Sequence, residues 1–421
     1  MAGKQENPFK YIDRPTLILM LALVVIGWVA IHAAVYSPQM GGPFNWEHAA
    51  GRQAVWILTS VFLFVVLFSM DYRLFEGMAS ISYIIMIGIL VATIFLGKEV
   101  NGAKAWIQIG PVGLQPGEFA KLATCLMVAS YLSSYDVRLE NQTTQLISAF
   151  IILVPAFLII LSRDTGSALV YASFIFVLQR EGLSIIYLVL GLATIAAIVL
   201  SILIPAPYLY GSVGVFMLLY VLFSRRKKQA SITAITWTAA STAIIYGVQY
   251  AFEHILQEHQ KTRILLLLGK IEDPSGAGYN VNQSLIAIGS GGFLGKGWLN
   301  GTQTKFDYVP EQTTDFIFCT IGEEWGFVGS TVLIILFGLL LFRIIHIGER
   351  MPTKFGRIYA YGVASIIFFH VLINLGMTMG ILPVIGIPLP FISYGGSSLW
   401  AFSILMAILL RMDAGMRSTM R

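Results

Sequence analysis

Long, uninterrupted apolar runs constrain this chain more than any other feature of its sequence. A helix that crosses a bilayer needs about 20 mostly apolar residues. The sequence holds twelve candidate runs, two of them short: 17–36, 53–71, 78–97, 117–134, 144–162, 166–181, 184–204, 208–223, 231–252, 314–345, 356–382 and 395–411. Only 12% of the residues are charged, whereas a soluble domain carries about 25%. We therefore predict an all-α polytopic membrane protein whose residues 1–421 form a single integral membrane domain.

Lysine and arginine near the ends of these runs predict the orientation, because cytoplasmic loops are enriched in both. With the N-terminus in the cytoplasm, most basic residues, including the run 225–228, fall in inside segments. An even number of spans returns the C-terminus to the cytoplasm. The segments 98–116, 163–165, 253–313 and 384–394 then face outward. The net charge of +5 is thus explained by membrane topology, and no nucleic-acid partner is expected.

The outward segments have unusual composition. Segment 98–116 is rich in glycine and proline but also contains Trp106, which predicts a re-entrant or interface-lying segment. Segment 383–398 has the same character, and its residues Pro383, Pro388 and Pro390 cannot continue a helix. Segment 253–313 is long and polar, and long loops in compact proteins are usually functional. We predict that it is a large extracytoplasmic loop that carries the chemistry.

Ionisable side chains inside spans are costly and therefore mark candidate sites. Glu118 and Lys121 are three residues apart on one helix face. Two interpretations stay open: a local ion pair that neutralises itself, or a pair that lines a polar cavity. Asp164 has two candidate partners as well, its neighbour Arg163 or Lys121.

Further polar residues enter the apolar runs. Glu323 and Glu324 are adjacent, so they diverge by about 100° on a helix and cannot both face one partner. His32 and His370 are predicted to form hydrogen bonds between helices. No set of His, Cys or carboxylate residues stands at the spacing of a zinc site.

The long outward segment contains Asp273 directly before Pro274. Asp-Pro with nearby glycines is ordinary turn chemistry. The same segment, however, holds Arg263 and Lys296, which are suited to an anionic group, and aromatic residues that can stack on sugar rings. This combination favours glycosyl transfer from a lipid-linked pyrophosphate donor. The carboxylate would accept the proton of the attacking hydroxyl, and the basic residues, with or without Mg²⁺ or Mn²⁺, would stabilise the pyrophosphate.

Four stretches carry a resemblance to a known family. They are Asn101–Lys121, with NGA, Trp106 and QPGE–K that includes Gln115; the corner Asp164–Ser167; Asp273–Gly297, with DP–GAGYN–QS–IAIGSGG–GKG; and Asn374–Ser398, with a PLPFISYGGSS ending that includes Ser393 and Ser397. Together they resemble the SEDS proteins (shape, elongation, division, sporulation), and the rod-shape members more than the division members. The resemblance covers nearly the whole chain.

The resemblance implies a peptidoglycan glycosyltransferase that polymerises lipid II on the outer face of the cytoplasmic membrane. It implies a class B penicillin-binding protein transpeptidase and the elongation machinery as partners, besides membrane lipid. The loop aspartate that matches Asp273 is the catalytic residue in that family, and Asp273 is the candidate if a metal is bound. The family's cavity and substrate-binding positions correspond here to Glu118, Lys121, Asp164, Arg263, Lys296, Trp106, Gln115, Ser393 and Ser397.

The chain departs from the family pattern in three places. Arg163 and Thr165 replace the corner's Pro and Leu, and Thr313 stands where His is common. The family shows ten spans, so the twelve predicted here imply an inserted helical hairpin at about 205–252. A lipid II flippase and a non-catalytic scaffold for the penicillin-binding protein remain alternatives, because charges and broken segments within a membrane also occur in transporters.

Overall fold

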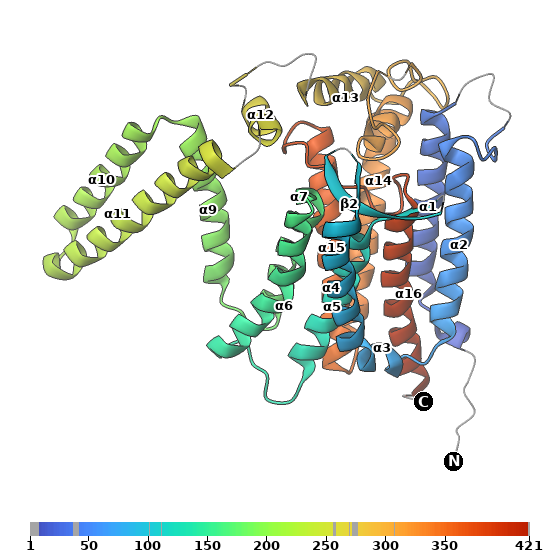
Figure 1. Cartoon of the computed structure of the whole chain (residues 1–421), viewed down its shortest axis with the longest axis horizontal. Coiled ribbons are helices and arrows are strands. Elements are labelled where there is room, and N and C mark those ends of the chain that lie inside the picture. Colours follow the sequence, from blue (N-terminus) through green and yellow to red (C-terminus); the bar gives the residue numbers. More distant parts are fainter. Residues whose placement is uncertain are drawn as a thin grey trace. The chain divides into compact units, whose positions relative to one another are not determined.

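The computed structural model describes residues 8–36, 42–100, 102–110, 112–255, 258–268, 270–271, 277–306 and 308–419. Helices dominate these residues, and short strands occur at one place (Figure 1). The elements, in chain order, are η1 (Pro8–Tyr11), α1 (Arg14–Ala34), α2 (Ala49–Ser69), α3 (Arg73–Gly77), α4 (Ala79–Leu96), β1 (Lys98–Val100), β2 (Ala103–Ile109), β3 (Val112–Leu114), α5 (Pro116–Ser133), α6 (Gln142–Leu161), α7 (Thr165–Leu169), η2 (Val170–Ser173), α8 (Phe174–Arg180), α9 (Ile185–Leu203), α10 (Ala206–Phe223), α11 (Lys227–Tyr250), η3 (Ala251–Ile255), α12 (Glu258–Leu267), α13 (Ala277–Gly291), α14 (Ile317–Arg350), α15 (Lys354–Thr378) and α16 (Gly396–Thr419).

The prediction of an all-α polytopic membrane protein is confirmed. Each predicted apolar run coincides with a helix, except that the run 166–181 is divided among α7, η2 and α8. Within the described part of the chain, nine helices are long and apolar enough to cross a bilayer, and Pro207–Phe223 is a shorter apolar helix. Helix α5 is not among the nine. The total of twelve spans therefore stays a prediction.

The chain forms two compact units. The first contains Met1–Leu183 and Tyr279–Arg421, and the second contains Ser184–Gly278. The predicted hairpin 205–252 lies within the second unit, where α10 and α11 pack against each other and α11 also packs against α9. Few residues of α9 and α11 are buried, 6% and 11% of their apolar windows. Such helices are suited to contact with lipid.

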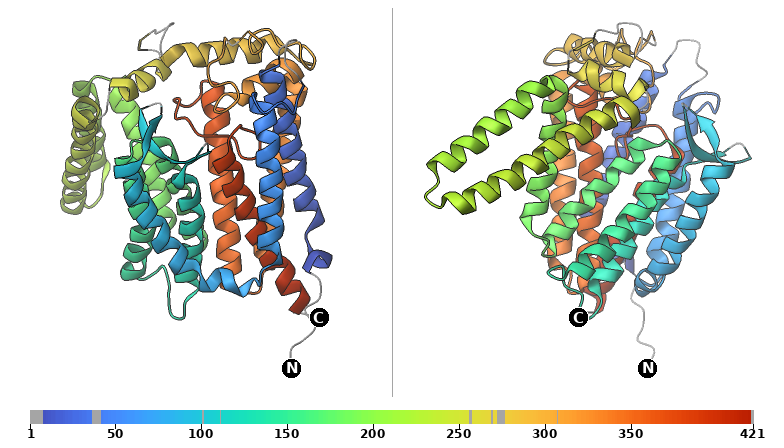
Figure 2. Two further views of the ribbon diagram at one scale, coloured as in Figure 1. Left: turned by 45° about the vertical axis from the view of Figure 1, so that its right-hand side comes forward. Right: turned by 60° about the vertical axis from the view of Figure 1, so that its left-hand side comes forward.

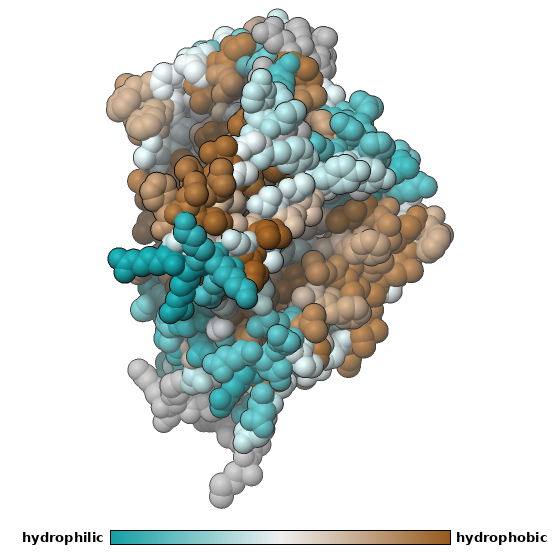
Figure 3. Space-filling view, turned by 90° about the vertical axis from the view of Figure 1, so that its left-hand side faces the viewer, coloured by the Kyte–Doolittle hydropathy of each residue, from teal (hydrophilic) through white to brown (hydrophobic). Residues whose placement is uncertain are grey.

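In the first unit α15 and α16 form the centre. The buried fractions of their apolar windows are 78% and 83%, against 17% for α4. Around them lie α1, α2, α5 and α14 (Figure 2). Figure 3 shows extended hydrophobic patches on one face, interrupted by hydrophilic groups; such exposed apolar surface is expected where lipid tails surround the helices.

Helix ends in the first unit are set by capping side chains. The carboxylate of Asp13 accepts from the backbone N–H of Thr16 at the start of α1. Asn141 and Thr353 cap α6 and α15 in the same way, through Thr143 N and Gly356 N. Such a cap satisfies one of the backbone donors that have no partner within the helix.

Segment 98–116, which we expected to be re-entrant or to lie at the interface, contains a three-stranded antiparallel sheet in the order β1-β2-β3. Ile107 pairs with Leu114, and Ile109 pairs with Val112. The sheet satisfies backbone groups that could not be left unpaired in an apolar setting. In Figures 1 and 2 both termini lie at one end of the helices of the first unit, and β2 and α13 lie at the other end.

Candidate functional site

The centre of the first unit contains a buried cluster of three ionisable side chains. Lys121 Nζ lies 2.8 Å from Glu118 Oε1 and 2.8 Å from His370 Nε2. Glu118 and Lys121 are each 1% exposed, and His370 is fully buried. The local ion pair, one of the two interpretations left open, is therefore formed, but with a third member from α15.

The hydrogen bonds of His370 assign its tautomer. An ammonium group only donates, so Nε2 of His370 accepts from Lys121 and its proton is on Nδ1. That proton is donated to the carbonyl oxygen of Pro388, 3.0 Å away. The expectation that His370 joins helices by hydrogen bonds thus holds, and His370 also fixes the proline-rich segment after α15. Glu118 Oε2 is buried and has no partner among the described residues.

Asn374 lies one turn after His370 on α15 and holds the same segment. Its amide nitrogen donates to the carbonyl oxygens of Ile387, at 2.7 Å, and Asp315, at 2.8 Å. Ser393 Oγ accepts from Leu389 N at 2.8 Å and donates to Thr314 O at 2.6 Å. Helix α15, the segment 384–394 and the start of α14 are therefore joined by direct hydrogen bonds.

A second polar group lies where α5, α7 and α16 begin. Gln115 Nε2 donates to Asp164 Oδ2 at 2.8 Å, and the backbone N–H of Gln115 donates to Ser397 Oγ at 3.1 Å. Asp164 also caps α7 through Ser167 N, at 3.0 Å. Four of the predicted site residues, including Glu118 one turn into α5, are thereby brought to one region of the fold. Asp164 and Lys121, which we considered as a pair, have other partners.

The first turns of α14 are joined to the segment 296–304 by Glu323. Its carboxylate accepts from Lys296 Nζ at 2.7 Å and from the backbone N–H groups of Thr302, Gln303 and Thr304 at 2.8, 2.9 and 3.0 Å. The side chain is fully buried. Lys296 is therefore part of a structural ion pair, and its predicted contact with phosphate stays a prediction.

Trp106 lies on β2, half-buried. A Cβ atom at Gly113 on β3 would lie 3.2 Å from the indole ring. Because glycine has no side chain, the indole ring of Trp106 can pack against the backbone of β3 at this position.

Two predicted residues lie apart from this description. Asp273, the predicted catalytic carboxylate, is outside the described residues. Arg263 lies on α12 of the second unit. Their contacts with the cluster around Lys121 stay predictions.

Sequence reasoning did not identify His370 as the partner of Lys121 or Glu323 as the partner of Lys296. The spacing of His370 and Asn374, four residues apart on one helix face just before the proline-rich segment, is the signal that could have identified the first. No local sequence signal connects Lys296 with Glu323, because the two residues are 27 positions apart and meet only through the folding of the segment between them.

The described residues contain no group of three or more His, Cys, Asp or Glu side chains that could hold a metal ion. These residues do not form a divalent cation site by themselves. What the arrangement offers is a buried ion pair, a carboxylate oxygen without a partner among the described residues and nearby amide and hydroxyl groups. Such groups can orient a polar substrate and stabilise charge on it.

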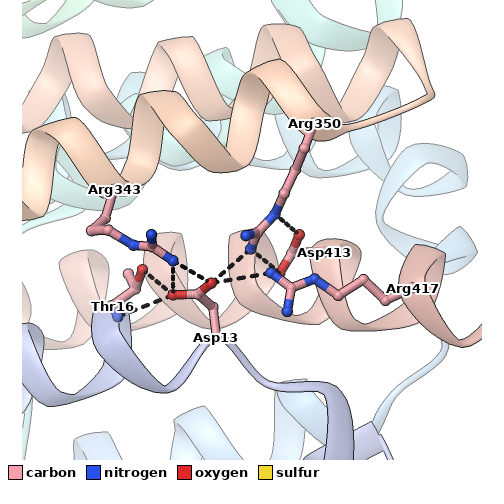
Figure 4. Close-up of polar contacts among 6 residues, drawn as sticks. All are labelled: Asp13, Thr16, Arg343, Arg350, Asp413 and Arg417. Carbon is pink, nitrogen blue, oxygen red and sulfur yellow. Dashed lines mark hydrogen bonds and ion pairs between the residues drawn. The ribbon is translucent and has the colours of Figure 1, made fainter.

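A third polar cluster ties the helices together at the end that carries the termini (Figure 4). Asp13 accepts from Arg343 at 2.7 Å, Arg350 at 2.8 Å and Arg417 at 3.1 Å. Asp413 accepts from Arg350 and Arg417 as well. Burial opposes ionisation of Asp13, but the hydrogen bonds from Arg343, Arg350 and Thr16 hold its pKa well below the usual range. This cluster is structural and joins α1, α14 and α16.

Comparisons with known proteins agree on one family. The FTSW_RODA_SPOVE model, described as "Cell cycle protein", matches residues 14–209 and 192–418. The peptidoglycan glycosyltransferase MrdB of Escherichia coli K12 is 35% identical over 415 residues, which covers 96% of each chain. The peptidoglycan glycosyltransferase RodA of Treponema pallidum is 33% identical over 435 residues, which covers 96% of this chain and 97% of its own.

Solved structures show the same fold. A chain from a peptidoglycan synthase complex, whose structure addresses the coordination of polymerization and crosslinking, matches with a TM-score of 0.69 at 28% identity. That match covers 96% of this chain and 97% of the other. The rod shape determining protein RodA of Thermus thermophilus matches with a TM-score of 0.62 at 25% identity, over 96% of each chain.

Proposed function

Because this chain belongs to the FTSW/RODA/SPOVE family of cell cycle proteins, we propose that it is a peptidoglycan glycosyltransferase of cell elongation and rod shape. It polymerises lipid II into glycan strands on the outer face of the cytoplasmic membrane. The observation that carries this proposal is the end-to-end match, at 35% and 33% identity, to two relatives named peptidoglycan glycosyltransferase. The helical fold and the buried polar site are consistent with it.

In the proposed mechanism Asp273 is the general base. It accepts the proton of an acceptor sugar hydroxyl as that oxygen forms a bond to the anomeric carbon of the donor. The bond from that carbon to the lipid-linked pyrophosphate breaks, and the pyrophosphate leaves with its negative charge. Arg263 is the proposed stabiliser of that charge.

The polar groups of the first unit are proposed to form the floor of the site. Gln115, Asp164 and Ser397 already join three helix starts through hydrogen bonds. The Glu118–Lys121 ion pair is buried, and fixed charges act more strongly in such surroundings than in water. We propose that Glu118 Oε2, a buried acceptor without a partner among the described residues, receives a donor from substrate or water in the working enzyme.

We propose a class B penicillin-binding protein as partner, because a related chain was solved within a synthase complex of polymerization and crosslinking. We also propose that both termini are cytoplasmic. Lysine and arginine are enriched in the segments that this orientation puts inside.

The decisive test compares the reconstituted wild-type chain with Asp273→Ala and Asp273→Asn, each with lipid II and the partner. We expect glycan polymer from the wild type and a loss of at least 100-fold in both variants, since a general base contributes roughly 10²–10⁴-fold. The matched control is Glu311→Gln, an exposed carboxylate in the same outward region. Undiminished polymer from Asp273→Ala would refute the mechanism.

The same preparations separate the alternatives. If the wild type makes no polymer but moves labelled lipid II across liposomes, the protein is a flippase. If it does neither but binds its partner, it is a scaffold. Both outcomes would overturn the proposed activity.

A further inference from the structure

A cavity of about 260 Å³ lies between α1, α2 and α16 of the first unit, and none of the polar-site residues lines it. Its wall is almost entirely apolar and includes Phe9 of η1. Leu21 and Val65, which also line it, are 41% and 43% exposed. The cavity therefore opens sideways, toward the hydrocarbon that surrounds a membrane-spanning helix.

Two serines explain why the helices leave this space. Ser60 on α2 and Ser403 on α16 line the cavity among large apolar side chains, and both are buried. Ser60 Oγ has no hydrogen-bond partner among the described residues. Its hydroxyl therefore forms no hydrogen bond with the described residues. Because serine is smaller than the apolar side chains around it, its effect at this position is to leave space in the cavity.

The cavity continues to the helix end that carries the termini, where basic side chains stand. On α1, Arg14, Leu17, Leu21 and Val24 follow one another at intervals of three, four and three residues, so they form one stripe on the helix. The last three line the cavity. Arg14 is exposed at the start of that stripe, and no ion pair is recorded for it in the described structure.

Lys10 is a second basic residue whose neighbours in sequence line the cavity. It is exposed, and it lies between Phe9 and Ile12, which both line the cavity. Its Nζ atom contacts only the ring of Tyr11, 5.6 Å from the centroid, among the contacts that the structure describes. The neighbouring cluster does not cancel these charges, because three arginines there face two aspartates.

We propose that this cavity is a binding site for one anionic phospholipid of the leaflet at the termini. One acyl chain fills the space beside Ser60 and Ser403. The phosphate group lies near Lys10 and Arg14, whose aliphatic stems can follow the apolar wall while their charges reach the headgroup. Along α1 the stripe from Leu17 to Val24 measures about 10 Å, enough for the upper part of an acyl chain.

Charge complementarity selects this occupant over a neutral lipid or an apolar helix. A basic residue near the membrane surface contributes a factor of roughly 5 to the binding of anionic lipid. A partner's transmembrane helix would fill the apolar space but would leave the two cations at its mouth without a counter-charge.

The test uses the full-length protein in phosphatidylcholine bilayers with spin-labelled phosphatidylglycerol or spin-labelled phosphatidylcholine, and measures the motionally restricted fraction of each probe. We expect the wild type to prefer phosphatidylglycerol by a factor of about 5 or more. Lys10→Gln/Arg14→Gln should abolish that preference. The matched control is Arg73→Gln/Arg138→Gln, which removes two exposed basic residues that do not line the cavity and should retain the preference.

A second variant tests the cavity itself. Ser60→Leu/Ser403→Leu fills the space, so it should reduce the restricted phosphatidylglycerol to the level of phosphatidylcholine while the fold is retained by circular dichroism. An equal loss of selectivity in both charge-removal variants would overturn the proposal, and so would full selectivity in the filled variant. Release of the restricted lipid when the partner protein is added would instead assign the cavity to a partner helix.

Discussion

Lys121 is 1% exposed and donates to Glu118 and His370 from one ammonium group. At the scale of single residues, the stability that the Glu118–Lys121 ion pair contributes depends on both members being present. Taking two charges out of water is costly, and removal of one leaves the other buried without compensation. The wild-type arrangement is therefore more sensitive to a single substitution than to the loss of the whole pair.

We predict that Lys121→Met destabilises the chain by about 3–5 kcal/mol. The double variant Lys121→Met/Glu118→Gln should recover a large part of that loss, because no buried charge is left unpaired. Thermal unfolding in detergent measures both. Lys104→Met, at an exposed lysine, serves as the control and should leave the melting temperature nearly unchanged. Equal melting temperatures for the single and double variants would contradict this account.

At the scale of elements, Glu323 connects α14 to the segment 296–304. Its carboxylate accepts hydrogen bonds from Lys296 Nζ and from three successive backbone N–H groups. Such charge-assisted hydrogen bonds are about twice as strong as neutral ones. One side chain therefore orders a turn that would otherwise have unpaired donors.

We predict that Glu323→Ala loosens this turn without unfolding the helices. Backbone amides of Thr302, Gln303 and Thr304 should exchange hydrogen faster by at least 10-fold, since each loses its acceptor. Hydrogen exchange read by mass spectrometry on peptides from this segment provides the measurement. Peptides from α15 should remain unchanged. Unaltered exchange at Thr302–Thr304 would show that the turn is held by other contacts.

The Asp13 cluster joins three helices and gives their packing a pH dependence. The pKa of Asp13 is lower in the folded chain than its unfolded value of about 3.9. The unfolded state therefore binds the proton more readily. The stability that ionised Asp13 provides is fully present above about pH 5 and is lost progressively as the pH falls through the unfolded pKa toward the lower folded pKa.

We predict that wild type and Asp13→Asn differ most in melting temperature at neutral pH and converge as the pH is lowered from about 5 toward 3. Because the other carboxylates titrate in both proteins, their effect on the melting temperature cancels when wild type and Asp13→Asn are compared at the same pH. Glu140→Gln, at an exposed carboxylate, should run parallel to wild type throughout. A difference that stays constant with pH would refute the linkage.

At the scale of the whole molecule, the proposed orientation separates the basic turn between α10 and α11 from the segment around Lys305. Both native cysteines, Cys125 and Cys319, are buried and free. They should therefore give little background in thiol labelling. Single cysteines can be introduced without removing either one.

We predict that, in intact cells, a membrane-impermeant maleimide labels Lys305→Cys but not Arg226→Cys or Arg138→Cys. All three variants should be labelled once the membrane is opened. Labelling of Arg226→Cys from outside would invert the orientation or change the number of spans before it. Failure to label Lys305→Cys from outside would move the segment 253–313, and Asp273 with it, from the outer face and remove the basis of the proposed mechanism.

The sequence alone determined the helical membrane class, because apolar runs of this length have few other stable states in water or lipid. Spacing along one helix also offered the Glu118–Lys121 ion pair as one of two interpretations, since residues three apart share a face, and the structure shows that pair. The motif resemblance identified the family that the comparisons confirm.

Only the tertiary structure decided the long-range partners. His370 follows Lys121 by 249 residues, and Glu323 follows Lys296 by 27. The cavity beside Ser60 also depends on helices that pack from elsewhere in the chain. Hydropathy and local spacing report what one segment prefers, whereas a partner is chosen by which segments meet when the apolar surfaces are buried.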